Sequence, residues 1–226
     1  VKLDLRRAWQ ISPIAAIGCM AIGMTNSAFR TMSPVYAQAI GMSVADVATF
    51  VSLSIIGGAM IQYPLGYASD RSDRRTVLLA TTTLALIVAV VLTVAGSDDR
   101  LLNFALIFVF GAFAMPLFSL SAAHANDRAK PNEFVMINAA LMLFYSFGAI
   151  GGPFAAAAMM EWYGPHALFS FTSVIYAVFI VLILYRMRKR PAAPSEERGR
   201  FTALLRTSTI FARLVPKTNP NGRANG

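Results

Sequence analysis

The chain has 226 residues, of which 56% are hydrophobic and 14% are charged, and its mean hydropathy is +0.57. A soluble domain has about a quarter of its residues charged, so this composition argues against a soluble enzyme. The formal net charge of +9 would suit a nucleic-acid-binding protein only if the charges formed one folded basic face. A single cysteine, Cys19, excludes an intramolecular disulfide, and with only two histidines besides we expect no metal site and no cofactor.

Six apolar stretches are each long enough to cross the hydrocarbon core of a bilayer as a helix, which takes about 20 residues. None of them contains Lys, Arg, Asp or Glu. Helices are expected because backbone amides in lipid must be paired within their own segment, and the alternating pattern of barrel strands is missing. The sequence therefore predicts an all-α integral membrane protein with six transmembrane helices, at residues 11–29, 47–68, 76–95, 101–123, 134–160 and 165–185.

Positive charges gather on one side of the predicted spans. Of the 20 Lys and Arg, all except Arg30 and Arg100 lie in the connections on that side or in the segments 1–10 and 186–226. Because cytoplasmic connections collect Lys and Arg, we predict both termini in the cytoplasm, with 1–10 as a linker and 186–226 as a basic tail. The net charge then reflects topology in the cell (inner) membrane. The tail is either mostly disordered, which its prolines favour, or a helix on the inner leaflet.

The connection between the second and third stretches carries five charges in a short turn, reading GYASDRSDRR over residues 66–75. Gly66 permits the close approach of a neighbouring helix. Asp70 can accept hydrogen bonds from nearby guanidinium groups and from the amino end of a facing helix. Such a cluster can act as a conformational latch that is released when helices rock. The alternative is a solvated topology signal, since any cytoplasmic loop collects arginine.

This turn resembles the loop G-x-x-x-D-[RK]-x-G-[RK]-[RK] that joins the second and third helices in each half of the major facilitator superfamily. The match comprises Gly66, Asp70, Arg71, Arg74 and Arg75, while Asp73 stands where the pattern has Gly. Segments 23–30, 33–37, 62–66 and 123–128 are similar to a bacterial branch of this family whose substrates are mostly unassigned.

The resemblance implies one half of a twelve-helix fold, and the long basic tail favours the C-terminal half. It also implies transport of a small solute by alternating access. The partners would be the lipid bilayer, the solute, and either an N-terminal six-helix half missing from this chain or a second copy. The start at Val1 instead of Met is compatible with a fragment, an alternative start or a trimmed chain.

Polar residues within the spans are the candidates for substrate binding, because polar groups in lipid are costly and face a bundle interior or a wet cavity. Asn26 and Arg30 lie four apart and share a helical face, where Arg30 would favour an anionic group. An arginine that snorkels to the outer headgroups explains Arg30 equally well. Gln62 could contact the solute or form a hydrogen bond between helices. Asn138 and Tyr145 complete the set.

Two further groups of residues have predicted mechanical roles. Gly148 and Gly152, four apart, form a close-packing surface, and Pro153 weakens the helix, so this segment is predicted to bend or slide. Asp127 and Arg128 are predicted to join the latch, with Asp70 and Arg128 as a possible direct pair. No acidic residue lies within a span, so proton coupling would need a carboxylate from elsewhere.

Two other classes of protein compete with a carrier. Ser119, Ser121 and His124 are close in sequence, as in an intramembrane protease, but the G-x-S-x nucleophile turn is missing and no base faces a serine at membrane depth. We therefore predict that the chain is not an enzyme. The second class is a non-transporting six-span protein, such as a sensor, a scaffold or a remnant half-transporter.

Overall fold

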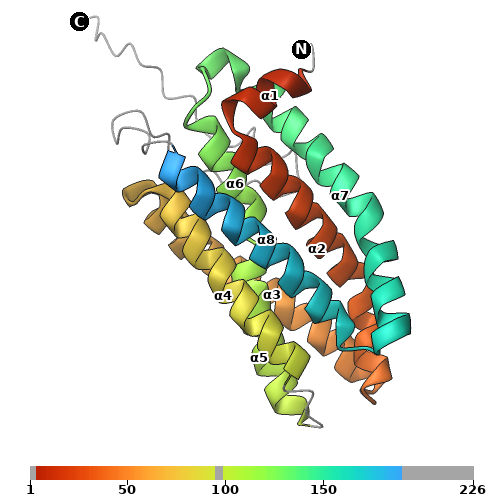
Figure 1. Ribbon diagram of the computed structural model, residues 1–226. Coiled ribbons are helices and arrows are strands. Elements are labelled where there is room, and N and C mark those ends of the chain that lie inside the picture. The colour runs from red at the N-terminus through yellow and green to blue at the C-terminus, as the bar shows by residue number, and fades with distance from the viewer. Residues whose placement is uncertain (1–3, 95–98, 190–226) are drawn as a thin grey trace, which may run out of the picture.

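Helices make up nearly all of the part of the chain that the computed structural model describes, which is residues 4–94 and 99–189. The long helices lie side by side and run roughly along one direction (Figure 1). The elements are α1 (Leu5–Ile11), α2 (Pro13–Ala39), α3 (Val44–Arg71), α4 (Arg74–Val94), α5 (Arg100–Ala114), α6 (Leu117–Asn126), the 3-10 turn η1 (Pro131–Glu133), α7 (Phe134–Tyr163) and α8 (Ala167–Lys189). The predicted tail from residue 190 onward lies outside the described residues.

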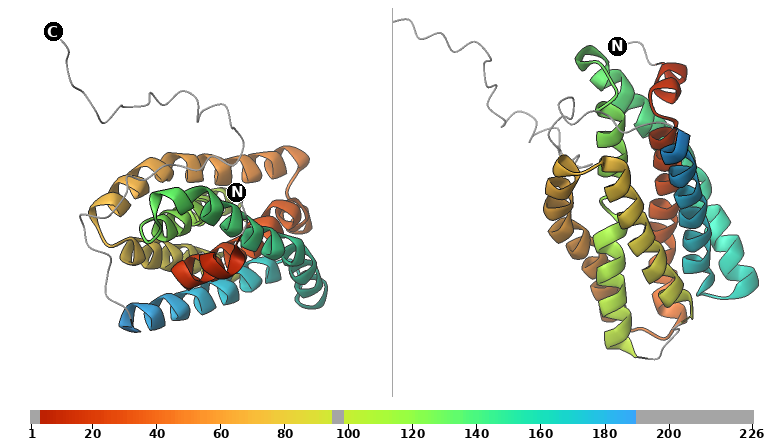
Figure 2. Two further views of the ribbon diagram at one scale, coloured as in Figure 1. Left: turned by 90° about the horizontal axis from the view of Figure 1, so that it is seen from above. Right: turned by 60° about the vertical axis from the view of Figure 1, so that its left-hand side comes forward.

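Five of these helices are long and apolar enough to cross a membrane when α5 and α6 are taken together. A sixth is added if α1 and α2 are taken as one broken span. The all-α membrane fold predicted from the sequence is therefore confirmed. The start of α2, the α3–α4 turn and the ends of α6 and α8 lie at one end of the bundle, which we call the basic end (Figures 1 and 2).

The first predicted span differs from the helix that the chain forms. Ile11 belongs to the short helix α1, and a bend of 111° separates α1 from α2. Ser12 causes the new start, because its side chain accepts a hydrogen bond from the backbone N–H of Ala15 (3.2 Å) and Pro13 follows at the first helical position. Helix α2 then continues to Ala39, so Arg30 lies inside a helix and not at its end.

The fourth predicted span is interrupted near its middle. Helix α5 ends at Ala114 and α6 begins at Leu117, with Pro116 between them. Proline has no backbone N–H and collides with the preceding turn, so it breaks the regular hydrogen-bond ladder. The two pieces still form one apolar rod of 27 residues from Arg100 to Asn126.

Glycines allow two pairs of helices to touch backbone to backbone. Helix α7 lies along α2, where a Cβ added at Gly148 would collide with the carbonyl oxygen of Met20 and one at Gly152 with that of Met24. Helix α3 lies along α5 in the same way, since a Cβ at Gly111 would collide with the carbonyl oxygen of Ser54. Close contact of this kind is the main source of helix association when apolar surface gains nothing by leaving lipid.

Aromatic side chains fill the interior at the end opposite to the basic end. Tyr36 of α2 meets Phe169 of α8 edge to face, with ring centroids 4.9 Å apart, and Phe110 of α5 meets the same Phe169 at 5.7 Å. Phe50 of α3 packs on Tyr36 at 5.9 Å. All four side chains are buried, so this cluster joins α2, α3, α5 and α8 by packing alone.

The glycine contacts predict a sharp difference between two neighbouring substitutions. Gly148→Ala should lower the stability of the protein by about 1–3 kcal/mol, because the added methyl group meets the backbone of α2. Gly151→Ala is the matched control, since a Cβ there has nothing within 4 Å and only improves helix propensity. The unfolding midpoint of each variant in mixed detergent micelles measures the difference. Equal midpoints for the two variants would contradict the close α2–α7 contact.

Candidate functional site

The turn between α3 and α4 is built by the charged residues that the sequence places there. Asp73 accepts a hydrogen bond from the backbone N–H of Arg75 (3.0 Å), which caps the start of α4. The same carboxylate also accepts from the guanidinium of Arg75 (2.9 Å). The aspartate that replaces glycine in the family pattern thus has a local function, because it holds Arg75 and starts the helix.

Arg74 is the centre of the charge cluster at the basic end. Its Nε donates to Asp127 (2.6 Å), its Nη2 donates to Asp70 (3.1 Å), and its Nη1 donates to the hydroxyl of Ser69 (3.4 Å). The side chains of Arg74 and Asp127 are only 3% and 6% exposed, so this is a buried ion pair. It connects α3, the start of α4 and the residue that follows α6. Removing one partner would leave a buried charge uncompensated.

The remaining residues of the predicted latch lie at different depths. Gly66 is buried within α3, whereas Arg71 is exposed at the end of that helix and lies over the ring of Tyr67, 4.0 Å from its centroid. Asp70 keeps 30% of its side chain exposed. The turn therefore has an inner part, built around Arg74, and an outer part formed by Asp70 and Arg71.

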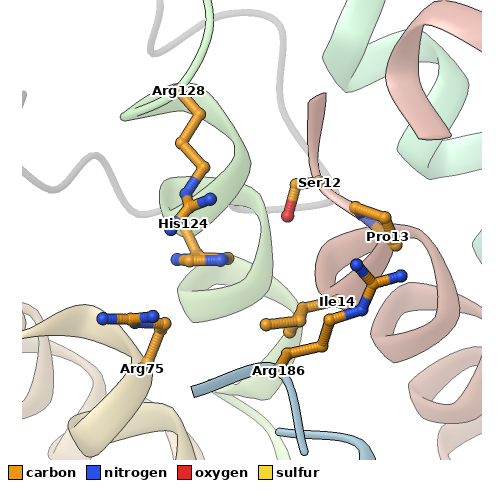
Figure 3. A pocket seen from close by; sticks show the side chains of 7 residues that line it. All are labelled: Ser12, Pro13, Ile14, Arg75, His124, Arg128 and Arg186. Atoms are coloured by element: carbon orange, nitrogen blue, oxygen red, sulfur yellow. The ribbon is translucent and has the colours of Figure 1, made fainter. Parts of the chain in front are cut away.

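Arg128 directly follows Asp127, the residue that caps the end of α6. It lines a pocket at the basic end together with Arg75, His124 and Arg186 (Figure 3). The described ion pairs of Asp70 and of Asp127 both run to Arg74. Arg74 thus joins the two loops that the sequence predicts to form one cluster, and a direct Asp70–Arg128 pair stays a prediction.

The polar residues proposed for substrate binding on α3 and α7 have partners on α6. Gln62 donates to the hydroxyl of Ser119 (3.5 Å), and this is a hydrogen bond between helices α3 and α6, one of the two roles that the sequence suggests for Gln62. Asn138 donates to the side-chain oxygen of Asn126 (3.2 Å). Tyr145 is buried. These side chains hold neighbouring helices together in this arrangement of the bundle.

The two candidates on α2 differ in their surroundings. Asn26 is buried at 7% exposure, whereas Arg30, one turn later, is exposed. Tyr145 packs edge to face on Phe118, with ring centroids 5.3 Å apart. None of the five proposed substrate-binding residues lines the pocket shown in Figure 3. The structure therefore does not gather them into one described site.

One contact at the basic end has no counterpart among the sequence predictions. Nε of Arg7 in α1 donates to Glu133 in η1 (2.9 Å), and Glu133 also accepts from the backbone N–H of Lys130 (3.1 Å). The hydrogen bond from Arg7 holds the pKa of Glu133 below its ordinary value. Since 126 residues separate the two partners, no local pattern could have indicated the pair.

Among residues 4–94 and 99–189, no group of three or more His, Cys, Asp or Glu side chains is arranged to hold a metal ion.

Comparison with known proteins links the chain to one family. Residues 15–218 match the Major Facilitator Superfamily. An uncharacterized MFS-type transporter of Yersinia pestis (strain Pestoides F) is 28% identical over 170 residues, which cover 74% of this chain and 42% of that protein. A relative described in the same words from Yersinia enterocolitica is 26% identical over 83% of this chain and 46% of its own length. A third, from Salmonella typhi, is 25% identical over 77% of this chain and 44% of its own length. The chain thus spans less than half the length of the curated relatives it matches.

The buried ion pair predicts unequal effects for two arginines of one turn. Arg74→Gln should destabilise the protein by about 3 kcal/mol or more, because Asp127 is left buried without its partner. Arg71→Gln should cost less than about 1 kcal/mol, since Arg71 is exposed and loses only a surface contact with Tyr67. Unfolding in mixed micelles measures both. The exchange Arg74→Asp with Asp127→Arg should recover part of the loss, and a double variant no better than the worse single one would contradict the pairing.

Proposed function

The chain belongs to the Major Facilitator Superfamily, and from this membership we propose that it is the C-terminal six-helix half of a carrier that moves a small solute by alternating access. Members of this family are transporters and not enzymes, which excludes the protease alternative for Ser119, Ser121 and His124. The five or six spans and the coverage of 42–46% of the relatives support a half.

The need for a partner is supported by the faces that the bundle leaves uncovered. In the most apolar 18-residue stretch of each span, 22% of the residues of α3 and 28% of those of α7 are buried, against 50% for α5 with α6. Exposed side chains on α3 include Ile56, Met60 and Tyr63, and those on α7 include Phe147 and Phe154. A six-helix half or a second copy packed on α3 and α7 would cover these surfaces.

We propose that the charged turn works as a latch with a fixed part and a moving part. Arg74 is committed to Asp127 within this bundle, so it holds the turn against α6 while the bundle rocks as a unit. Asp70 and Arg71, which reach the surface, would then contact the facing half in one of the two states. The exposure of Arg71 beside the buried Arg74 is what supports this division.

The solute pathway is proposed to include Arg30. Helix α2 continues from Arg30 to Ala39, about two and a half turns further, so the exposed guanidinium lies well inside the helix. A charge at such a position needs water or a polar partner. We propose that Arg30 faces a wet cavity between the two halves and attracts an anionic group of the solute, with Asn26 and Gln62 near the same wall.

Cysteine labelling tests this placement, and the single native cysteine, Cys19, is buried and gives a low background. Arg30→Cys should react with a membrane-impermeant thiol reagent, whereas Val178→Cys, an exposed position midway along α8, should stay unlabelled in lipid. Equal protection of both positions would rule out a wet cavity at Arg30.

The membrane topology is tested in the same way at the basic end. Asn132→Cys should react only after cells are opened if both termini are cytoplasmic in the inner membrane. Labelling of this position in intact cells would show the opposite topology.

The function itself is tested on the complete reading frame. Sequencing the DNA upstream of the codon for Val1 should reveal six further spans, and the whole protein should then move solutes in vesicles. Arg71→Glu should abolish this movement while leaving the unfolding midpoint of the protein unchanged, because Arg71 is placed in the moving part of the latch.

If no further spans are encoded, cross-linking in membranes should detect paired copies. Monomers alone would instead favour the non-transporting alternative, a sensor, a scaffold or a remnant.

A further inference from the structure

A pocket lies at the basic end where four helices meet. Its lining comes from the start of α2, from α4, from α6 and the loop after it, and from the last turn of α8. It comprises Ser12, Pro13, Ile14, Arg75, His124, Arg128 and Arg186 (Figure 3). We call it the arginine pocket. Its Arg186 and its α2 wall take no part in the charge cluster around Arg74.

The charge of this lining is strongly one-sided. Three of the seven described residues that line the pocket are arginines and none is acidic. Arg75 is only 4% exposed, and its charge is balanced in part by Asp73 outside the lining. The pocket thus collects guanidinium groups from α4, α8 and the segment after α6, and like charges repel more strongly where water is excluded.

A second observation comes from Arg186. Its Nε is buried and donates no hydrogen bond to any residue within the described part of the chain. Burying a donor without an acceptor is costly, and in proteins such a group commonly donates to a water molecule or a bound ion. The Arg186 side chain extends from α8 toward Pro13 at the start of α2 (Figure 3). An oxyanion placed between them would accept this hydrogen bond.

The helix that begins at the pocket also favours an anion. Helix α2 has 27 residues, and Ser12 and Pro13 at its amino end line the pocket. The amino end of a helix carries partial positive charge, and its first backbone N–H groups have no acceptor within the helix. Pro13 has no N–H, but that of Ile14, in the same first turn, is directed toward this end.

We propose that the arginine pocket binds a phosphate-type anion, supplied either by a phospholipid headgroup or by free phosphate. Planar guanidinium groups bind phosphate oxygens through paired hydrogen bonds, and Arg128 and Arg186 line the pocket from opposite sides (Figure 3). The bound anion joins the last turn of α8 to the first turn of α2 and to α6. Occupancy therefore stabilises the basic end. This binding does not depend on whether the chain transports a solute.

The experiment uses the full chain purified in mild detergent. Native mass spectrometry and the thermal unfolding midpoint are recorded with phosphatidylglycerol, with phosphatidylcholine and with inorganic phosphate. One phosphatidylglycerol should remain bound and raise the midpoint, and Arg186→Gln should weaken this binding about tenfold or more, as expected for a lost charge-assisted hydrogen bond. Arg188→Gln is the matched control, since it removes the same charge from an exposed position two residues further along α8.

The two sources give different results. If inorganic phosphate alone raises the midpoint and displaces the lipid, the pocket takes free phosphate, and if only phosphatidylglycerol does so, it takes a headgroup. Arg186→Lys keeps the charge but not the planar fork, so it should fold and bind more weakly, which keeps the test valid if Arg186→Gln does not fold. The proposal is overturned if neither anion binds, if phosphatidylcholine binds equally, or if Arg188→Gln loses as much binding as Arg186→Gln.

Discussion

The buried ion pair between Arg74 and Asp127 is the interaction on which the arrangement of the basic end depends. Both side chains are almost fully covered, so neither charge can exist there without the other. The pair also determines where the next residues lie, because Arg75 comes directly after Arg74 and Arg128 comes directly after Asp127. Pairing the first two residues therefore brings the second two toward one space, the arginine pocket. A single contact thus accounts for the fixed part of the latch that we propose and for the proposed anion site.

Glycines give the rest of the bundle its form. The backbone contacts at Gly148 and Gly111 bind α7 to α2 and α3 to α5 without the hydrophobic gain that drives packing in water. At the opposite end Tyr36, Phe110 and Phe169 fill the interior. Charge holds one end of the bundle and apolar packing holds the other. This difference agrees with a body that rocks as a unit while its outer charges, Asp70 and Arg71, meet and leave a partner.

Helix breaks and side-chain contacts show where reading the sequence reaches its limit. Ser12 and Pro13 have the residue types of a helix start, but they lie within the apolar run from Ile11 to Phe29, so hydropathy does not separate α1 from α2. The same run ends at Phe29, although α2 continues to Ala39. From the sequence Gln62 is open to two interpretations, and its hydrogen-bond partner Ser119 is known only from the folded chain. The sequence predicts that Asp127 joins the charge cluster, but the residue that reaches it, Arg74, is known from the folded chain alone.

By itself the sequence determined the helical membrane fold, the charge asymmetry and the family, because hydrophobic length and a short charged loop are local properties of the chain. Only the tertiary structure decided which arginines of the charged turn are buried, that Arg7 pairs with Glu133, and that Arg75, Arg128 and Arg186 surround one pocket. These contacts join segments that are far apart in the chain. Their distances follow from how the helices pack, which hydropathy and spacing do not encode.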